Sequence, residues 1–264
     1  MFGRKVEPVT YGYELQPFIL DGQTVQFAQW LHPGNTVIPL TESMLKELRG
    51  FLRPGDVAID VGAYTGDLSV PIALATGPTG AVLAFEPNPY VFKILQANAA
   101  LNPGRLNILP LNFAATKEDG EIEFEYSDPG YCNGGRHEGI SSLKHGHVFP
   151  LTVHGRNAGH FLQREYANLL TQLRYVKVDA EGYDLSVLQS MEAILRKYKP
   201  FVTAEVFRWS PKETRTALYR YMQRLGYDVY RVRKGSYFVG EEKLAETDMG
   251  KWAHFDIFCV PKAI

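Results

Sequence analysis

The fold of this chain is decided by one stretch, Asp56-Val57-Ala58-Ile59-Asp60-Val61-Gly62-Ala63-Tyr64-Thr65-Gly66-Asp67. Its apolar run, Val57 to Val61, is typical of a strand buried on both faces of a parallel sheet. The two glycines allow a tight turn and a close approach of the backbone to a ligand. The apolar run that follows has helical length, and its Pro71 is tolerated only in the first helical turn. A strand carrying an acid, a glycine turn and a helix predict an open α/β sheet that binds a nucleotide-like cofactor.

A second carboxylate follows the next apolar run and sharpens this prediction. Residues 81–85 read as another buried strand, and Glu86-Pro87-Asn88-Pro89 comes directly after it. A carboxylate at the tip of the second strand can accept both hydroxyls of a ribose, so Glu86 indicates a ribosyl cofactor. A dinucleotide site needs G-x-G-x-x-G, but the turn here lacks the middle glycine that approaches a pyrophosphate. The pattern disfavours a nucleotide-dependent oxidoreductase, which remains the alternative enzyme class.

Length and composition indicate one large α/β domain. The chain has 264 residues, 45% of them hydrophobic, and a net charge of −1, which gives no electrostatic argument for nucleic acid or a membrane surface. We see no apolar run near the ~20 residues of a membrane span and no secretory signal. Cys132 and Cys259 are expected to be free thiols. These features predict a cytoplasmic enzyme and leave its oligomeric state open.

The chain divides into a lead-in and a core. We expect residues 1–53 to form a flap, with a hairpin turn at Asp21-Gly22 and a helix capped by Thr41. The competing interpretation is that this segment only covers one sheet edge. Residues 54–264 contain five strand-then-helix units and two closing strands, which predict a mostly parallel sheet with helices on both faces. Single helices are expected over residues 159–173 and 183–198, and a loop over residues 233–254.

An insert at about residues 127–160 lacks a regular pattern. It contains five of the seven histidines, namely His137, His145, His147, His154 and His160. A loop of this length is uncommon unless it is functional or disordered, so we expect it to cover the acceptor and to supply a base or a ligand. The competing interpretation is a solvated loop with incidental histidines, since the pair around Gly146 is not by itself a metal motif.

Four carboxylates fall where predicted core strands end, namely Asp60, Glu86, Asp179 and Glu205. Ligands of open α/β sheets bind beyond the carboxyl ends of the strands, so these side chains are expected to converge on one crevice. Lone acids at strand tips are otherwise often helix caps or surface charges. Lys177 lies on the same strand face as Asp179, either as a substrate contact or in a structural ion pair.

Three blocks together resemble the FkbM-type S-adenosylmethionine-dependent methyltransferases in order and spacing. They are residues 60–66, residues 85–89 and Val176-Lys177-Val178-Asp179-Ala180-Glu181-Gly182. The similarity covers roughly Val57 to Pro261, with one departure, because the family usually has Asn where this chain has Tyr64. The resemblance implies a Rossmann-like class I methyltransferase fold, with a mostly parallel seven-stranded sheet whose last strand is inserted antiparallel.

The resemblance also implies the roles of particular residues. The cofactor-binding set is expected to be Asp60, Gly62, Tyr64, Thr65, Gly66, Glu86, Pro87, Asn112, Phe113 and Asp179. Asn112 or Phe113 would lie near the base, although Asn112 alone reads as a turn residue. The expected substrate contacts are Ser142, Lys177 and Glu181. Ser142 is included because Ser141-Ser142-Leu143 is similar to a serine-leucine step in the family's insert, and Glu181 because it matches the family's third block.

The expected chemistry is in-line transfer of a methyl group, in which alignment does most of the catalytic work. A hydroxyl acceptor must also lose its proton, and Asp179, Glu205 or His145 could take it. A divalent metal on Asp179 and Glu205 could serve instead, but it is not favoured because no compact ligand motif is present. The sequence thus predicts an S-adenosylmethionine-dependent O-methyltransferase acting on a sugar, glycosylated or natural-product hydroxyl. A cofactor-binding protein without turnover is the non-enzymatic alternative.

Overall fold

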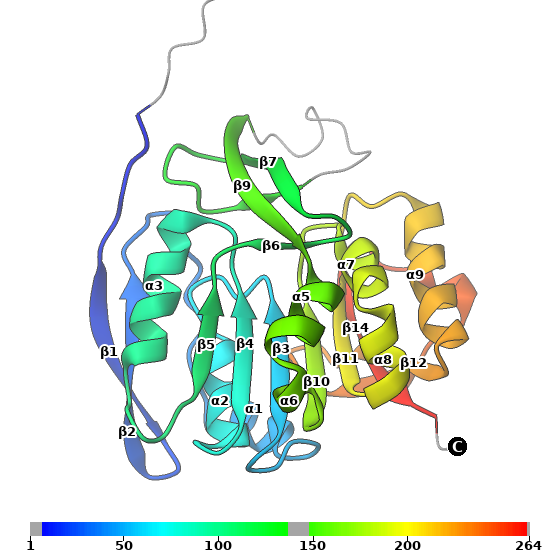
Figure 1. Ribbon diagram of the computed structural model, residues 1–264, viewed down its shortest axis with the longest axis horizontal. Helices are drawn as coiled ribbons and strands as arrows, with labels where there is room; N and C mark the ends of the chain where they lie inside the picture. The colour runs from blue at the N-terminus through cyan, green and yellow to red at the C-terminus, as the bar shows by residue number, and fades with distance from the viewer. Residues whose placement is uncertain (1–6, 137–147, 263–264) are drawn as a thin grey trace, which may run out of the picture.

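The computed structural model describes residues 7–136 and 148–262, and its centre is an eight-stranded sheet (Figure 1). The strand order is β13-β12-β14-β11-β10-β3-β4-β5. Five strands are parallel: β3 (Val57–Val61), β4 (Ala81–Phe85), β5 (Ile108–Leu111), β10 (Leu173–Val178) and β11 (Phe201–Val206). The other three are antiparallel to their neighbours: β14 (Phe255–Pro261) between β11 and β12 (Tyr227–Val232), and β13 (Gly240–Lys243) beside β12.

This order confirms the predicted mostly parallel sheet and the inserted antiparallel last strand. All seven predicted strands are present, and β13 adds a short eighth strand at the edge. The loop expected over residues 233–254 was wrong in part, because this segment contains β13 and the 3-10 helix η1 (Glu246–Gly250). The sequence of β13, Gly-Glu-Glu-Lys, has no apolar alternation, so nothing in it signalled a strand.

Helices cover both faces of the sheet. One apolar core includes residues of α1 (Glu42–Leu48), α2 (Ser69–Thr76) and α3 (Pro89–Ala100). The other includes residues of α5 (Ala158–Glu165), α6 (Ala167–Leu170), α7 (Asp184–Ser190), α8 (Glu192–Tyr198) and α9 (Lys212–Arg224). The single helices expected over 159–173 and 183–198 are each broken in two. The breaks lie at Tyr166, whose φ of −131° is not helical, and at Met191, whose side chain is fully buried.

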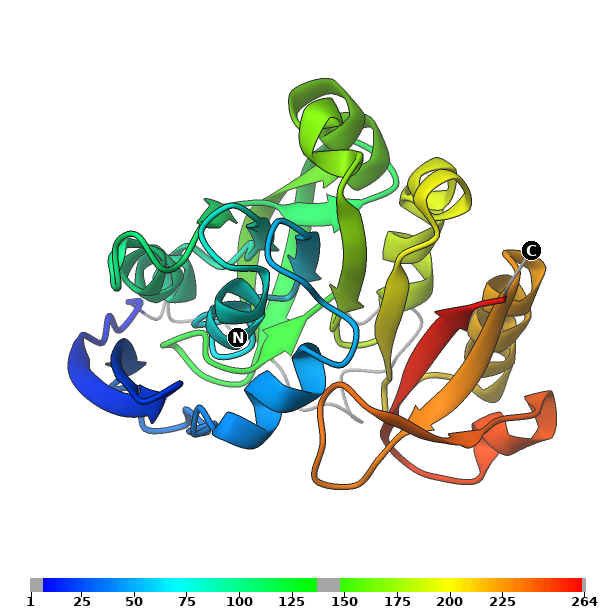
Figure 2. The same ribbon diagram turned by 90° about the horizontal axis from the view of Figure 1, so that it is seen from below.

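The N-terminal segment forms a separate antiparallel pair, β1 (Tyr13–Leu20) and β2 (Gln23–Trp30). The turn is the predicted Asp21-Gly22, where both residues have positive φ, as a two-residue hairpin requires. Asn98 of α3 accepts from the Ala28 N–H at 2.6 Å and donates to the Ala28 carbonyl oxygen at 3.1 Å. The hairpin is therefore fixed against α3, at the end of the molecule opposite β12 and β14 (Figure 2).

A four-stranded sheet lies over the carboxyl ends of the parallel strands (Figure 1). Its strands are β6 (Ala114–Thr116), β9 (Phe149–Asn157), β7 (Gly120–Tyr126) and β8 (Gly134–Gly135). The prediction of irregular structure over residues 127–160 is thus partly wrong, because β9 is an extended strand paired with β7. Phe149, Leu151 and Val153 alternate with more exposed residues, a signal that the histidines obscured.

Two further expectations concern single side chains and membrane spans. Cys132 and Cys259 are both buried free thiols, as predicted. Within the described ranges, no helix is both long enough and apolar enough to cross a membrane.

Candidate active site

The turn between β3 and α2 brings the backbone of two strand ends into contact. Gly62 has a φ of +75°, and a Cβ atom there would lie 1.9 Å from the carbonyl oxygen of Asp179. The N–H groups of Gly62 and Ala63 both donate to the Phe85 carbonyl oxygen at 3.0 Å. Glycine at position 62 is required both by the conformation and by the space. The turn therefore holds the ends of β3, β4 and β10 together at one edge.

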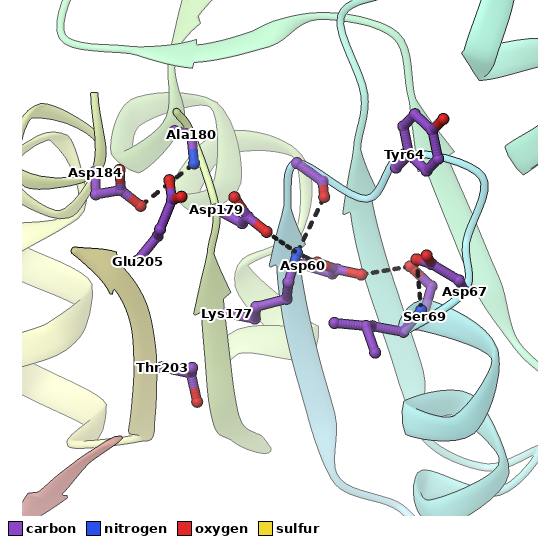
Figure 3. A network of polar contacts seen from close by, with 12 residues as sticks. Asp60, Tyr64, Asp67, Ser69, Lys177, Asp179, Ala180, Asp184, Thr203 and Glu205 are labelled. Carbon is purple, nitrogen blue, oxygen red and sulfur yellow. Dashed lines mark hydrogen bonds and ion pairs between the residues drawn. The ribbon is translucent and has the colours of Figure 1, made fainter. Parts of the chain in front are cut away.

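A buried ion pair lies beneath this edge (Figure 3). Lys177 of β10 is in register with Asp60 of β3, and its Nζ lies 3.1 Å from Asp60 Oδ1. The ammonium also donates to the Gly62 carbonyl oxygen at 3.0 Å, and Asp179 Oδ2 lies 3.9 Å away. Ser69 donates to the other Asp60 oxygen at 2.6 Å. Burial lowers the pKa of Lys177, but the carboxylates of Asp60 and Asp179 overcome this and hold it above its ordinary value.

Two interpretations of Lys177 were predicted, a substrate contact and a structural ion pair. The structure shows the ion pair with Asp60. Asp60 is fully buried behind Lys177, whereas the Asp179 side chain is 48% exposed. The first and fourth predicted strands are neighbours, as the convergence of Asp60 and Asp179 requires.

Glu86, at the tip of β4, is buried and held by two backbone groups. Its Oε2 accepts from the Tyr64 N–H at 2.9 Å, and its Oε1 accepts from the Asn88 N–H at 2.8 Å. Asn88 caps α3 as predicted, with Pro89 at the first helical position. Burial raises the pKa of Glu86 to about 7, against these two N–H groups, which lower it. Each carboxylate oxygen keeps acceptor capacity for a ligand.

Tyr64 occupies the position where the resembling family usually has asparagine, and its side chain makes contacts outside the turn. Its φ is +51°, a left-handed conformation that asparagine adopts more readily than tyrosine. The phenol donates to Asn35 Oδ1 at 3.0 Å and lies 3.0 Å from Cys132 Sγ. The ring also packs edge-on against Trp30, with centroids 5.9 Å apart. Tyr64 therefore links the turn to the N-terminal segment and to the loop that precedes β8.

The opposite end of the edge is rich in carboxylates (Figure 3). Glu205 of β11 is 7% exposed; its Oε1 lies 3.4 Å from His254 Nδ1, and its Oε2 has no hydrogen-bond partner. Asp256 of β14 stands opposite Glu205 in the antiparallel register. Asp184 accepts from the Ala180 and Gly182 N–H groups at 3.3 and 3.1 Å.

Burial and mutual repulsion perturb the titration of these carboxylates. Burial, and then the charge of Asp179, raise the pKa of Glu181 and of Asp184 to about 8. Burial raises the pKa of Asp256 to about 7, and raises that of Glu205 well above its ordinary value. Perturbed acids in a cavity are a common feature of functional sites.

A cavity of about 390 Å³ joins the two ends. Its cofactor end is defined here by Gly62, Tyr64 and Glu86, and its acidic end by Glu205 and Asp256. The predicted site residues that line it are Gly62, Tyr64, Glu86, Pro87, Phe113, Lys177, Asp179, Glu181 and Glu205. The predicted residues that do not line it are Asp60, Thr65, Gly66 and Asn112; Ser142 and His145 lie outside the described residues.

The predicted residues that do not line the cavity have structural contacts. Asn112 donates to the Glu86 carbonyl oxygen at 2.8 Å, and the Thr65 carbonyl oxygen accepts from Asn98 at 2.8 Å. Asp67, His254 and Asp256 are among the lining residues that sequence reasoning missed. Asp256 was missed because β14 runs antiparallel, so its first residues, not its last, reach this edge. Among the described residues, no three His, Cys, Asp or Glu side chains are grouped so that they could hold a metal ion.

The strand order, with β14 antiparallel between β11 and β12, and the cavity at the strand ends define a Rossmann-like class I methyltransferase fold. A profile described as Methyltransferase FkbM domain matches residues 60–229, and the chain belongs to that family. The chain is therefore a member of a methyltransferase family and not the nucleotide-dependent oxidoreductase that was the alternative enzyme class.

One curated relative is the hexuronic acid methyltransferase AglP of Haloferax volcanii, which is 32% identical over 154 residues. The match covers 57% of this chain and 56% of AglP, so the chain spans about half the length of this relative. Among solved structures, the chain is similar to methyltransferase FkbM from Methylobacillus flagellatus, with 13% identity, 82% and 51% coverage, and a TM-score of 0.46. Precorrin-6y C5,15-methyltransferase from Geobacter metallireducens gives 15% identity, 83% and 86% coverage, and a TM-score of 0.45.

Proposed function

We propose that this protein is an S-adenosylmethionine-dependent O-methyltransferase that acts on a hydroxyl of a sugar or of a glycosylated small molecule. The observation that carries the proposal is Glu86, whose two oxygens are oriented by the Tyr64 and Asn88 N–H groups at the cofactor end of the cavity. A carboxylate in this position can accept both hydroxyls of a ribose.

The residues around Glu86 fit the rest of the cofactor. Gly62 has no side chain to keep a ligand from the backbone, and Phe113 offers an apolar ring in the same cavity. When bound, S-adenosylmethionine supplies an electrophilic methyl group on a sulfonium. The surrounding carboxylates suit a positively charged ligand, because unlike charges attract more strongly in a partly desolvated cavity.

We assign the general base of the reaction to Asp179. Its side chain is half-exposed, lines the cavity and lies between the two ends, where an acceptor hydroxyl can reach it. Glu205 is the second candidate, but it is buried, whereas the half-exposed Asp179 side chain is more accessible to an acceptor hydroxyl. The substrate contacts predicted at Lys177 and Glu181 remain part of this proposal, with Lys177 acting chiefly through Asp60.

Two neighbouring segments are proposed to close over the acceptor. Thr36 and Ile38 of the N-terminal segment line the cavity, and so do residues 132–135 of the insert. These positions support the flap and cover predicted at 1–53 and 127–160. The sugar acceptor is supported by the name of the relative AglP, which describes a hexuronic acid methyltransferase.

Two measurements test the proposal. Isothermal titration calorimetry with S-adenosylhomocysteine should show saturable binding. Transfer of a labelled methyl group from S-adenosylmethionine into mixed glycans should show base-stable incorporation, as expected for an ether and not for a methyl ester. Absence of cofactor binding contradicts the proposal outright, while binding without incorporation into glycans or cell extract supports the non-catalytic alternative.

A further inference from the structure

The acidic end of the cavity carries an excess of negative groups. Four carboxyl groups, those of Asp179, Glu181, Glu205 and Asp256, line this end and the wall beside it. Among the described residues that line the cavity, Lys177 is the single lysine or arginine, and Asp60 already pairs with it at 3.1 Å. A buried carboxylate without a partner is costly, so such a group favours a ligand that completes it.

Glu205 shows that a partner is missing at this end. Although the side chain is only 7% exposed, its Oε2 makes no hydrogen bond. The buried guanidinium of Arg215, which is influenced by the charge of Glu205, is bound to backbone, donating to the carbonyl oxygens of Phe207 at 2.8 Å and Trp252 at 2.7 Å. His254 reaches only the other oxygen, at 3.4 Å, and is half-exposed. Glu205 thus lines the cavity while one of its oxygens, buried within the wall, has no hydrogen-bond partner among the described residues.

We propose that Glu205 and Asp256 bind a protonated amine on the acceptor, so that the substrate is an amino sugar or another amine-bearing glycoside. Glu205 and Asp256 are directly paired in the antiparallel β11–β14 register, so their side chains lie side by side on one face of the sheet, where one ammonium group can bind both. An ammonium has three donors and no acceptor, which matches an unpartnered carboxylate oxygen. The inference rests on the proposed function, because it names the acceptor of the same site.

The same carboxyl groups disfavour an anionic acceptor. A uronate carboxylate at this end would lie beside Glu205, Asp256 and Asp179, and the single lysine or arginine among the described lining residues, Lys177, already pairs with Asp60. Desolvated like charges disfavour the wrong ligand and so create specificity. The acceptor of this chain therefore differs in charge from the hexuronic acid in the name of AglP.

Three glycosides that differ at one substituent test the inference. The p-nitrophenyl β-glycosides of glucosamine, glucose and glucuronic acid are titrated into the full chain by calorimetry, with and without saturating S-adenosylhomocysteine. We expect the glucosaminide to bind at least about tenfold more tightly than the glucoside, and the glucuronide to bind most weakly. Equal binding of the glucosaminide and the glucoside, tighter binding of the glucuronide with or without Mg²⁺, or no glucosaminide binding at millimolar concentration each overturns the inference.

Variants then locate the amine. Glu205→Gln should remove most of the preference for the glucosaminide while leaving affinity for S-adenosylhomocysteine within about threefold. Asp256→Asn provides an independent variant, and Glu213→Gln, at an exposed position on α9, is the matched control that should change nothing. An amine preference that survives both cavity variants contradicts the assignment. Failure of S-adenosylhomocysteine to bind defeats only the proposed function, because the glycoside preference is also measured on the free protein.

Discussion

Glu86 and Glu205 stand at the tips of two parallel strands with the same 7% exposure, but the fold treats them differently. Both oxygens of Glu86 accept backbone N–H groups, supplied by the left-handed turn at Tyr64 and by the start of α3. Within the described residues, Glu205 accepts no backbone N–H group, and its Oε2 has no partner. Burial therefore does not by itself define the environment of an acid. Backbone groups of the fold satisfy Glu86, whereas Glu205 keeps an oxygen without a partner in the part of the chain that the structure describes.

The largest expected effect concerns the ion pair that lies between these two ends. Lys177→Met should lower the free energy of unfolding by about 3–5 kcal/mol, because Asp60 then remains as a buried charge without a cation. Urea denaturation followed by circular dichroism measures this. Lys251→Met, which removes an exposed ion pair with Asp248, is the control and should cost at most about 1 kcal/mol. Equal losses for the two variants would show that Lys177 does not support the site.

The next effect separates the two glutamates by ligand. Glu86→Ala should weaken S-adenosylhomocysteine binding about 100-fold, since two charge-assisted hydrogen bonds to the ribose are lost. Glu205→Ala should change that affinity by less than about threefold, because Glu205 lies at the other end of the cavity. Calorimetry on both variants, with far-ultraviolet circular dichroism as a check on folding, decides the comparison. A comparable loss at Glu205 would break the division into two ends.

A third prediction concerns pH. The pKa values of Glu86 and Asp256 are raised to about 7, and those of Glu181 and Asp184 to about 8. Because carboxyls in unfolded chains titrate near pH 4, the folded state binds more protons between about pH 4 and pH 8, so stability falls as pH rises through this range. Differential scanning fluorimetry of the free protein from pH 5 to pH 9 should show a falling melting temperature. Glu205→Gln should make the curve shallower; a curve that rises throughout contradicts the raised pKa values.

The smallest effect tests how the cofactor end is joined to its surroundings. Tyr64→Phe removes the hydrogen bond to Asn35 and the contact with Cys132 Sγ, and should cost about 1 kcal/mol of stability. Tyr13→Phe, at an exposed position on β1, is the matched control. Urea denaturation compares the two. No difference between them would mean that the phenol does not hold the turn to the N-terminal segment.

The strands and acids that depend on local pattern could be read from the sequence. Buried apolar runs identified β3, β4, β10 and β11, and because parallel strands end at one edge, Glu86, Asp179 and Glu205 were predicted to line one site. Asp256 could not be found this way, since its position depends on a register between strands far apart in the chain. The breaks at Tyr166 and Met191 were not predicted either, since neither position nor its chain neighbours is a proline or glycine that would signal the end of a helix.

The contact between Gly62 and the Asp179 carbonyl oxygen has a consequence for how this site can change over time. A single methyl group at position 62 would collide with the backbone of Asp179, so glycine at this position sets how closely the turn after β3 approaches the end of β10. Tyr64, two residues later, points toward the N-terminal segment, where a bulky ring is accommodated. A side chain at position 62 would therefore change the spacing of two strand ends, whereas a change in the ring at position 64 would change the contacts with the N-terminal segment and with Cys132.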